Sequence, residues 1–190
     1  MKVNRKLFLE EVLKTRGNKG NQYCKYSGVN CMFDWCAIFT SYIMREVAGI
    51  KDFPNDFPKS TSCTQIKNSS FAIPKVNRSF KTAEVGDIIL FELNNNTSDG
   101  PEHIGIVTEN NNGLISVLEG NTGNTDFNKS YVAVYTYSVD NSALDCIIDM
   151  SDFFTDELIQ NTEKPVIKSS ETQMREVFKK IKELLLSIEI

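Results

Sequence analysis

The stretch at residues 84–118, EVGDIILFELNNNTSDGPEHIGIVTENNNGLISVL, predicts three consecutive β-strands. Residues 84–87 are typical of a turn, and the apolar run at residues 88–93 that follows predicts a buried strand. Further strands are predicted at residues 103–109 and 114–118, separated by polar loops rich in Asn and Gly. Because loops of this kind join strands that run in opposite directions, the stretch predicts an antiparallel sheet.

Residues on either side of this stretch extend the sheet and add helices before it. Alternating residues at 131–137 predict a fourth strand, and residues 144–148 predict a fifth. Upstream, residues 4–16 carry one apolar face and predict a helix that ends at Gly17. Residues 17–33 lack periodicity and predict a long loop.

Two more helices are predicted between this loop and the sheet. Asp34 is a suitable N-cap for a helix from Trp35 to about Val47. Ser60 or Thr61 can cap a short helix that runs through Ile66. Helices followed by a meandering sheet define an α+β domain with an antiparallel sheet, which we assign to residues 1–150.

Residues 151–190 differ in composition and form a predicted linker and C-terminal helix. Ser170 and Gln173 fit a capping box at the start of this helix. Apolar residues then recur at heptad spacing: Met174, Phe178, Ile181, Leu185 and Ile188. The helix is expected to dock on its own domain, to form a homo-oligomer, or to lead to a module not present here.

Composition excludes several classes of partner and cofactor. The net charge of −4 argues against binding to nucleic acid or to an anionic membrane, and no stretch is apolar enough to span a bilayer. Among five cysteines there is no Cys-x-x-Cys pair, and with one histidine this argues against zinc. The odd cysteine count argues against a disulfide framework, so Cys63 and Cys146 are expected to be core thiols.

The first residues, Met1 to Lys6, are basic, but Glu10 and Glu11 interrupt the apolar stretch behind them. An amphipathic helix therefore fits this segment better than a signal peptide does. We expect the protein to be made in the cytoplasm without a signal peptide. It then acts after release, or it is a domain excised from a larger exported protein.

Cys36 stands where the Gly- and Asn-rich loop gives way to an apolar, helix-like run. In the first turn of a helix, a thiol meets the positive end of the helix dipole, which lowers its pKa. His103, the one histidine of the chain, opens the second predicted strand. A lone cysteine is most often a core residue. A neighbouring imidazole takes the proton of such a thiol, however, so the two together predict a cysteine nucleophile.

A histidine that acts as a base needs a polar partner to fix its tautomer and orientation. Glu119 and Asn121 follow the third predicted strand, next to the strand that begins with His103. Either side chain can supply this contact, although both also fit an ordinary turn. A cysteine at a helix start, a histidine at a strand start and a polar residue on the next strand divide the work as in papain-like enzymes.

With these residues, the sequence resembles the CHAP domain family, the cysteine- and histidine-dependent amidohydrolases/peptidases, over roughly residues 1–150. It is closest to the forms found in firmicute and phage lysins. The resemblance implies a papain-like fold, with N-terminal helices packed on an antiparallel sheet. It rests on five segments in order: Gly17-Asn18, Trp35-Cys36-Ala37-x-Phe39, Gly86-Asp87-Ile88-Ile89-Leu90-Phe91, His103-Ile104-Gly105-Ile106-Val107 and Glu119-Gly120-Asn121.

The resemblance implies a nucleophile at Cys36, a general base at His103 and orienting residues at Glu119 and Asn121. It also implies peptidoglycan as the partner and substrate, cut at the muramoyl–L-alanine amide or at a peptide bond of the stem or cross-bridge. Such an enzyme is a hydrolase that degrades cell walls through an acyl-enzyme, as an endolysin does. Two alternatives stay open: an intracellular cysteine amidase acting on a small peptide-like substrate, and an inactive wall-binding module.

Further residues are candidates for contact with the substrate. Backbone N–H groups at the start of the Cys36 helix are expected to stabilise the oxyanion, helped by Gln22 or Asn30. Trp35 and Tyr23 can line the groove, although packing explains each at least as well. Some relatives bind calcium in the loop before the nucleophile. This loop has no acidic residue between Gly17 and Phe33, so we expect no metal and no cofactor.

Overall fold

The computed structural model describes residues 2–52, 55–77, 79–94 and 100–157. The chain divides into a compact unit, Met1–Glu157, and a second unit, Leu158–Ile190. The C-terminal helix predicted from the heptad pattern lies outside the described residues. Within those residues, no helix is long and apolar enough to cross a membrane.

A six-stranded antiparallel sheet forms the centre of the first unit, in the order β2-β7-β3-β4-β5-β6. The five strands predicted from the sequence are all present, which confirms the α+β class. The sixth, β2, has two residues and was not predicted, because so short a strand has no periodicity to detect. The strands are β2 (Val76–Asn77), β3 (Ile88–Phe91), β4 (His103–Asn111), β5 (Leu114–Thr122), β6 (Tyr131–Ser138) and β7 (Leu144–Ile148).

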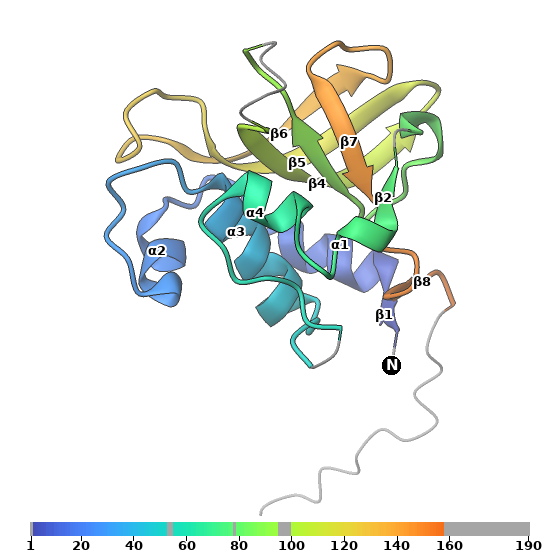
Figure 1. Ribbon diagram of the computed structural model, residues 1–190, viewed down its shortest axis with the longest axis horizontal. Helices are drawn as coiled ribbons and strands as arrows, with labels where there is room; N and C mark the ends of the chain where they lie inside the picture. The colour runs from blue at the N-terminus through green and yellow to red at the C-terminus, as the bar shows by residue number, and fades with distance from the viewer. Residues whose placement is uncertain (1, 53–54, 78, 95–99, 158–190) are drawn as a thin grey trace, which may run out of the picture. The chain divides into compact units, whose positions relative to one another are not determined.

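Helices α1, α3 and α4 lie on one side of this sheet (Figure 1). The predicted helices appear as α1 (Arg5–Leu13), α3 (Cys36–Tyr42), which continues as a π-helix at Ile43–Val47, and α4 (Cys63–Lys67). Short 3-10 turns occur at Ile73–Lys75 and Phe80–Thr82. Helix α2 (Asn21–Ser27) lies inside the segment predicted as a loop, so that prediction was wrong. Its mostly polar residues give no apolar stripe, and only Tyr23 and Cys24 are buried.

Two helix caps differ from the predicted ones. The residue before α3 is Trp35, and no side chain caps this helix end. The Asp34 carboxylate instead accepts a hydrogen bond from Asn121 at 2.6 Å. Helix α4 is capped by Ser62, whose side chain accepts from the Gln65 N–H, rather than by Ser60 or Thr61.

The sheet buries apolar side chains on both faces. Even-numbered residues such as Ile104, Ile106 and Leu118 join the larger cluster with the helices. Odd-numbered residues such as Val107 and Val117 join a smaller cluster on the other face. Because side chains alternate along a strand, His103 and Glu119 lie on the face of this smaller cluster.

The first unit extends beyond the predicted boundary at residue 150. Strand β8 (Phe154–Thr155) pairs in parallel with β1 (Val3–Asn4). Phe154 is 2 % exposed, and its ring lies 4.7 Å from the ring of Phe8. Residues 151–157, which the sequence placed in the linker, therefore pack on the first unit.

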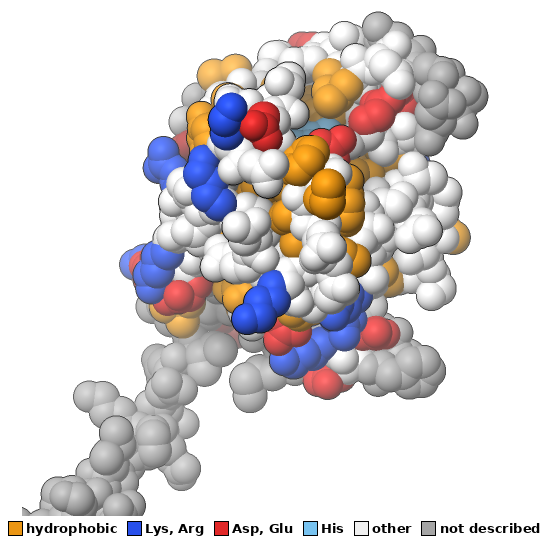
Figure 2. Space-filling view, turned by 90° about the vertical axis from the view of Figure 1, so that its left-hand side faces the viewer, with side chains coloured by type: hydrophobic (Ala, Val, Ile, Leu, Met, Phe, Trp, Pro, Cys, Tyr) orange, Lys and Arg blue, Asp and Glu red, His pale blue; other side chains and the backbone are white. Residues whose placement is uncertain are grey.

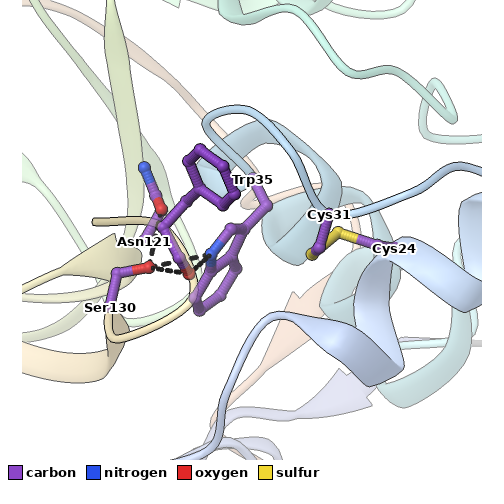
Figure 3. Close-up of a disulfide and its surroundings, with 6 residues drawn as sticks. Cys24, Cys31, Trp35, Asn121 and Ser130 are labelled. Carbon is purple, nitrogen blue, oxygen red and sulfur yellow. Dashed lines mark hydrogen bonds between the residues drawn. A yellow bond between two sulfur atoms is a disulfide. The ribbon is translucent and has the colours of Figure 1, made fainter. Parts of the chain in front are cut away.

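A disulfide joins Cys24 and Cys31, contrary to the prediction from the cysteine count (Figure 3). Gly28 ends α2 with a positive φ of 74°, which only glycine adopts readily, and the chain turns back on itself. The turn brings the two Cα atoms to 5.4 Å. Cys36, Cys63 and Cys146 are buried thiols outside the disulfide, so the five cysteines form one bridge and three thiols.

Candidate active site

Cys36 occupies the first turn of α3 and is 3 % exposed. Two other groups lie within contact distance of its sulfur. The Sγ of Cys63 is 3.7 Å away, and the backbone oxygen of Glu102 is 3.9 Å away. Because Glu102 precedes His103, the nucleophile candidate lies at the beginning of β4, beside the candidate base.

His103 is held from its far side by a carboxylate. Its Nε2 lies 2.9 Å from Oε2 of Glu119 on the neighbouring strand β5. Gly105 stands opposite Glu119 in the sheet, and a Cβ there would come within 2.8 Å of Glu119 Cγ. The glycine two residues after the histidine therefore leaves the space in which Glu119 reaches the imidazole.

Tyr137 on β6 holds the second oxygen of the same carboxylate. Its hydroxyl donates to Glu119 Oε1 at 2.7 Å, and Glu119 is only 2 % exposed. With one oxygen on His103 and the other on Tyr137, the carboxylate cannot rotate without losing a hydrogen bond. Sequence reasoning missed Tyr137, because only the pairing of β5 with β6 brings it near Glu119.

Asn121, the other candidate partner of His103, has contacts elsewhere. Its Nδ2 donates to Asp34 Oδ1, and its Oδ1 accepts from the hydroxyl of Ser130 at 2.8 Å. That hydroxyl in turn accepts from Trp35 Nε1 at 3.0 Å (Figure 3). Asn121 therefore connects the end of β5 to the two residues before Cys36, and Glu119 is the residue that contacts His103.

Gly120 lies between these two side chains and allows β5 to approach the nucleophile helix. A Cβ at this position would meet Phe39 Cβ at 2.6 Å and the Trp35 ring at 2.8 Å. Asn121 then adopts a positive φ of 60°, which asparagine tolerates better than most residues. Each residue of the Glu119-Gly120-Asn121 segment is thus required by a different contact or backbone conformation.

The electrostatics of the site favour a thiolate beside an imidazolium. The hydrogen bond from Cys63 lowers the pKa of Cys36, while burial raises it. The hydrogen bond and charge of His103 lower it further, and the pKa of Cys36 is about 5. Burial disfavours the charged ring of His103, but hydrogen bonds and charges from Cys36 and Glu119 outweigh it and raise the pKa to about 10. Between these values the pair carries a thiolate nucleophile and a proton to donate.

A hollow of about 460 Å³ opens beside His103 and Glu119. Besides those two residues it is lined by Phe91, Leu93, Asn121, Thr122, Gly123, Asn124, Thr125 and Tyr137. Figure 2 shows histidine at the surface as a small area between hydrophobic and acidic side chains. The hollow borders the imidazole and its carboxylate partner, and Cys36 is not among the residues that line it.

The four predicted substrate-binding residues do not line this hollow. Trp35 and Tyr23 are 0 % exposed, and their rings stack 5.6 Å apart, which favours the packing alternative, so their role in substrate binding stays a prediction. Gln22 is exposed on α2. Asn30 lines a separate hollow with the Cys24–Cys31 loop. Neither amide has a contact to Cys36 in the structure, so the oxyanion role of Gln22 or Asn30 stays a prediction.

Among residues 2–52, 55–77, 79–94 and 100–157, no group of three or more His, Cys, Asp or Glu side chains is arranged to hold a metal ion. The described site contains the thiol of Cys36, the imidazole of His103, the carboxylate of Glu119 and the phenol of Tyr137. These groups suit nucleophilic attack and proton transfer.

Comparison with known families and proteins gives one match. The CHAP domain family model matches residues 26–121, just over half of the 190-residue chain. No curated protein and no solved structure matches significantly. The chain belongs to the CHAP family, whose members are amidohydrolases and peptidases, and the match includes Cys36, His103, Glu119 and Asn121.

Proposed function

We propose that this protein hydrolyses an amide bond of bacterial peptidoglycan through Cys36. The observation that carries the proposal is that the Cys36 thiol lies against the backbone of Glu102, while the next residue, His103, is held by the carboxylate of Glu119 and helps to lower the pKa of Cys36. A metal-free amidase needs this set of groups: a nucleophile, a base beside it and a residue that orients the base. The CHAP match supports peptidoglycan as the substrate class, since domains of this family often act on it.

In the proposed reaction, the Cys36 thiolate attacks the carbonyl carbon of the scissile amide. His103 Nε2 is hydrogen-bonded to Glu119. The other ring nitrogen, Nδ1, therefore exchanges the proton with the thiol and with the leaving amine. The imidazolium gives its proton to the departing amine, which leaves an acyl-enzyme on Cys36. His103 then takes a proton from water, and the resulting hydroxide releases the acid and restores the thiolate.

The negative charge on the carbonyl oxygen needs hydrogen-bond donors during this attack. The first N–H groups of a helix have no partner within the helix. Cys36 begins α3, and no side chain caps this end, so its backbone N–H groups are suitable donors. A side-chain donor from Gln22 or Asn30 requires the preceding loop to approach the groove when substrate binds.

We further propose that the protein acts as a lysin of phage or prophage type, outside the reducing cytoplasm. The disulfide Cys24–Cys31 supports this location, because cytoplasmic thiols are generally kept reduced. The same observation weighs against an intracellular amidase. An inactive wall-binding module is disfavoured by a thiol whose pKa is lowered to about 5, since wall binding requires no thiolate.

The test uses purified peptidoglycan with the wild type, Cys36→Ala and Cys146→Ala. Cys146 is also a buried cysteine outside any disulfide, but it lies on β7 and serves as the matched control. The wild type and Cys146→Ala should release fragments, and Cys36→Ala should release none. Mass spectrometry of the fragments identifies the bond. If the wild type releases no fragment from walls of any peptide type but cleaves soluble amides, the substrate proposal fails while the mechanism survives.

A further inference from the structure

Cys63 is a buried thiol that the proposed hydrolysis does not use. It begins α4 just after the cap residue Ser62, and it is 6 % exposed. Cys36 begins α3 in the same way, so the two helices direct their first residues toward one another. The two sulfur atoms lie 3.7 Å apart, within the contact distance of a sulfur hydrogen bond.

A disulfide between these two residues requires only a small movement. The bonded distance between two sulfurs is about 2.05 Å, so Cys36 and Cys63 must approach by about 1.7 Å from their present separation. Rotation of the two side chains can supply this movement, since both sulfurs lie at the ends of single-carbon stems. The thiolate of Cys36 is also the form of a cysteine that reacts with peroxide.

We propose that Cys63 is a resolving cysteine, which converts oxidised Cys36 into a reversible Cys36–Cys63 disulfide. This inference rests on Cys36 being the reactive thiol of the proposed function. It assigns to the site an oxidative modification that blocks the nucleophile and protects it from further oxidation. The Cys24–Cys31 disulfide shows that bridges form elsewhere in the same unit, so the inference fits a protein exposed to oxidants.

The chemistry needs a peroxide as oxidant and a dithiol as reductant. The Cys36 thiolate attacks one oxygen of hydrogen peroxide, the O–O bond breaks, and protonation of the leaving hydroxide gives Cys36 sulfenic acid and water. The Cys63 sulfur then attacks the Cys36 sulfur, the S–O bond breaks, and the Cys63 proton leaves with the oxygen as water. In total, two thiols and one peroxide become one disulfide and two waters.

Reduction by the external dithiol breaks the Cys36–Cys63 disulfide in two steps. A thiolate of the external dithiol attacks the sulfur of Cys63 and expels the Cys36 thiolate. Cys36 is the better leaving group, because thiols of lower pKa leave faster. The second thiol of the reductant then releases Cys63, and the pair returns to its starting state. Without Cys63, sulfenic acid at Cys36 is open to a second peroxide, which forms sulfinic acid irreversibly.

The experiment compares the wild type with Cys63→Ala, Cys63→Ser and the matched control Cys146→Ala. Each protein receives hydrogen peroxide, then catalase, and half of each sample then receives dithiothreitol. The readouts are peptide mass spectrometry and the fraction of Cys36 that reacts with iodoacetamide, relative to the untreated sample of the same protein. Circular dichroism verifies that each variant is folded, and Cys63→Ser replaces Cys63→Ala should the smaller side chain unfold the protein.

In the wild type and Cys146→Ala, peroxide should produce a cross-linked Cys36–Cys63 peptide and a loss of Cys36 reactivity that dithiothreitol reverses. In the Cys63 variants the loss should be irreversible, with sulfinic acid at Cys36. Sulfinic acid and no cross-link in the wild type, or equal recovery with and without Cys63, would overturn the proposal. These readouts need no wall cleavage, so they hold or fail independently of the peptidoglycan substrate.

Discussion

Replacing Glu119 by Gln tests whether this carboxylate maintains the charged state of the Cys36–His103 pair. Glutamine keeps the shape of the side chain and one acceptor for His103 Nε2, while its amide group can donate to the Tyr137 hydroxyl oxygen. The substitution therefore removes the charge and keeps the packing. The Glu119 and His103 side chains are only 3 % and 13 % exposed, so solvent screens this interaction little.

The size of the expected pKa shift follows from the free energy that the His103–Glu119 hydrogen bond loses when its acceptor becomes neutral. A hydrogen bond to a charged group contributes about 1.5–3 kcal/mol and a neutral one about 1 kcal/mol, so the loss is about 0.5–2 kcal/mol. Since 1.36 kcal/mol corresponds to one pKa unit, the pKa of His103 should fall by about one unit. The thiolate loses part of its stabilisation in turn, and the pKa of Cys36 should rise from about 5 by about one unit.

The assay measures the rate of alkylation by iodoacetamide as a function of pH. Cys36 is the thiol that this assay follows, because the hydrogen bond with Cys36, together with burial, raises the pKa of Cys63 well above its usual range. The control is Glu109→Gln, the same substitution at an exposed position on β4, the strand that begins with His103, which should leave the midpoint unchanged. An unchanged midpoint in Glu119→Gln would refute the reasoning.

Three further predictions concern the surroundings of the pair. Tyr137→Phe removes the hydroxyl that fixes Glu119, and the lost hydrogen bond contributes about 1.4 kcal/mol to the orientation of the carboxylate. Steady-state kinetics should therefore show a kcat about tenfold lower, with a smaller change in KM. An unchanged kcat would exclude the orienting role. Gly120→Ala places a Cβ 2.6 Å from Phe39 Cβ and should destabilise the fold by about 1–3 kcal/mol in chemical unfolding; a loss below about 0.5 kcal/mol contradicts the close approach. Dialysis against EDTA should leave activity and Tm unchanged, because the segment 17–33 has no carboxylate; a loss that calcium restores would reveal a metal site.

The central strands and main helices were predictable because burial leaves a pattern in the sequence. Residues 88–91 are buried on both faces of the sheet and therefore form a continuous apolar run. Helix α2 and the two-residue strands leave no such pattern. The α2 sequence is mostly polar, and β1, β2 and β8 each have two residues and are too short for alternation.

The site was partly predictable for a related reason. Cys36 and His103 stand at boundaries between a loop and a regular element, which the sequence reveals directly. The choice between Glu119 and Asn121 depended on a bulge after Glu119, where the pairing of β5 with β6 shifts and Asn121 turns toward Asp34. Tyr137 and Cys63 approach the site only through tertiary packing, although Cys63, like Cys36, directly follows a possible helix-cap position.

The hydrogen bond of Trp35 makes the catalytic end of the molecule visible to optical spectroscopy. Trp35 is the single tryptophan of the chain, immediately precedes Cys36, and is fully buried with its N–H on Ser130. Indole emission depends on the polarity around the ring, and with one tryptophan in the chain this emission has one origin and reports on one place. Opening of the segment at residues 121–130 would shift the emission to longer wavelength, while circular dichroism would follow the sheet separately.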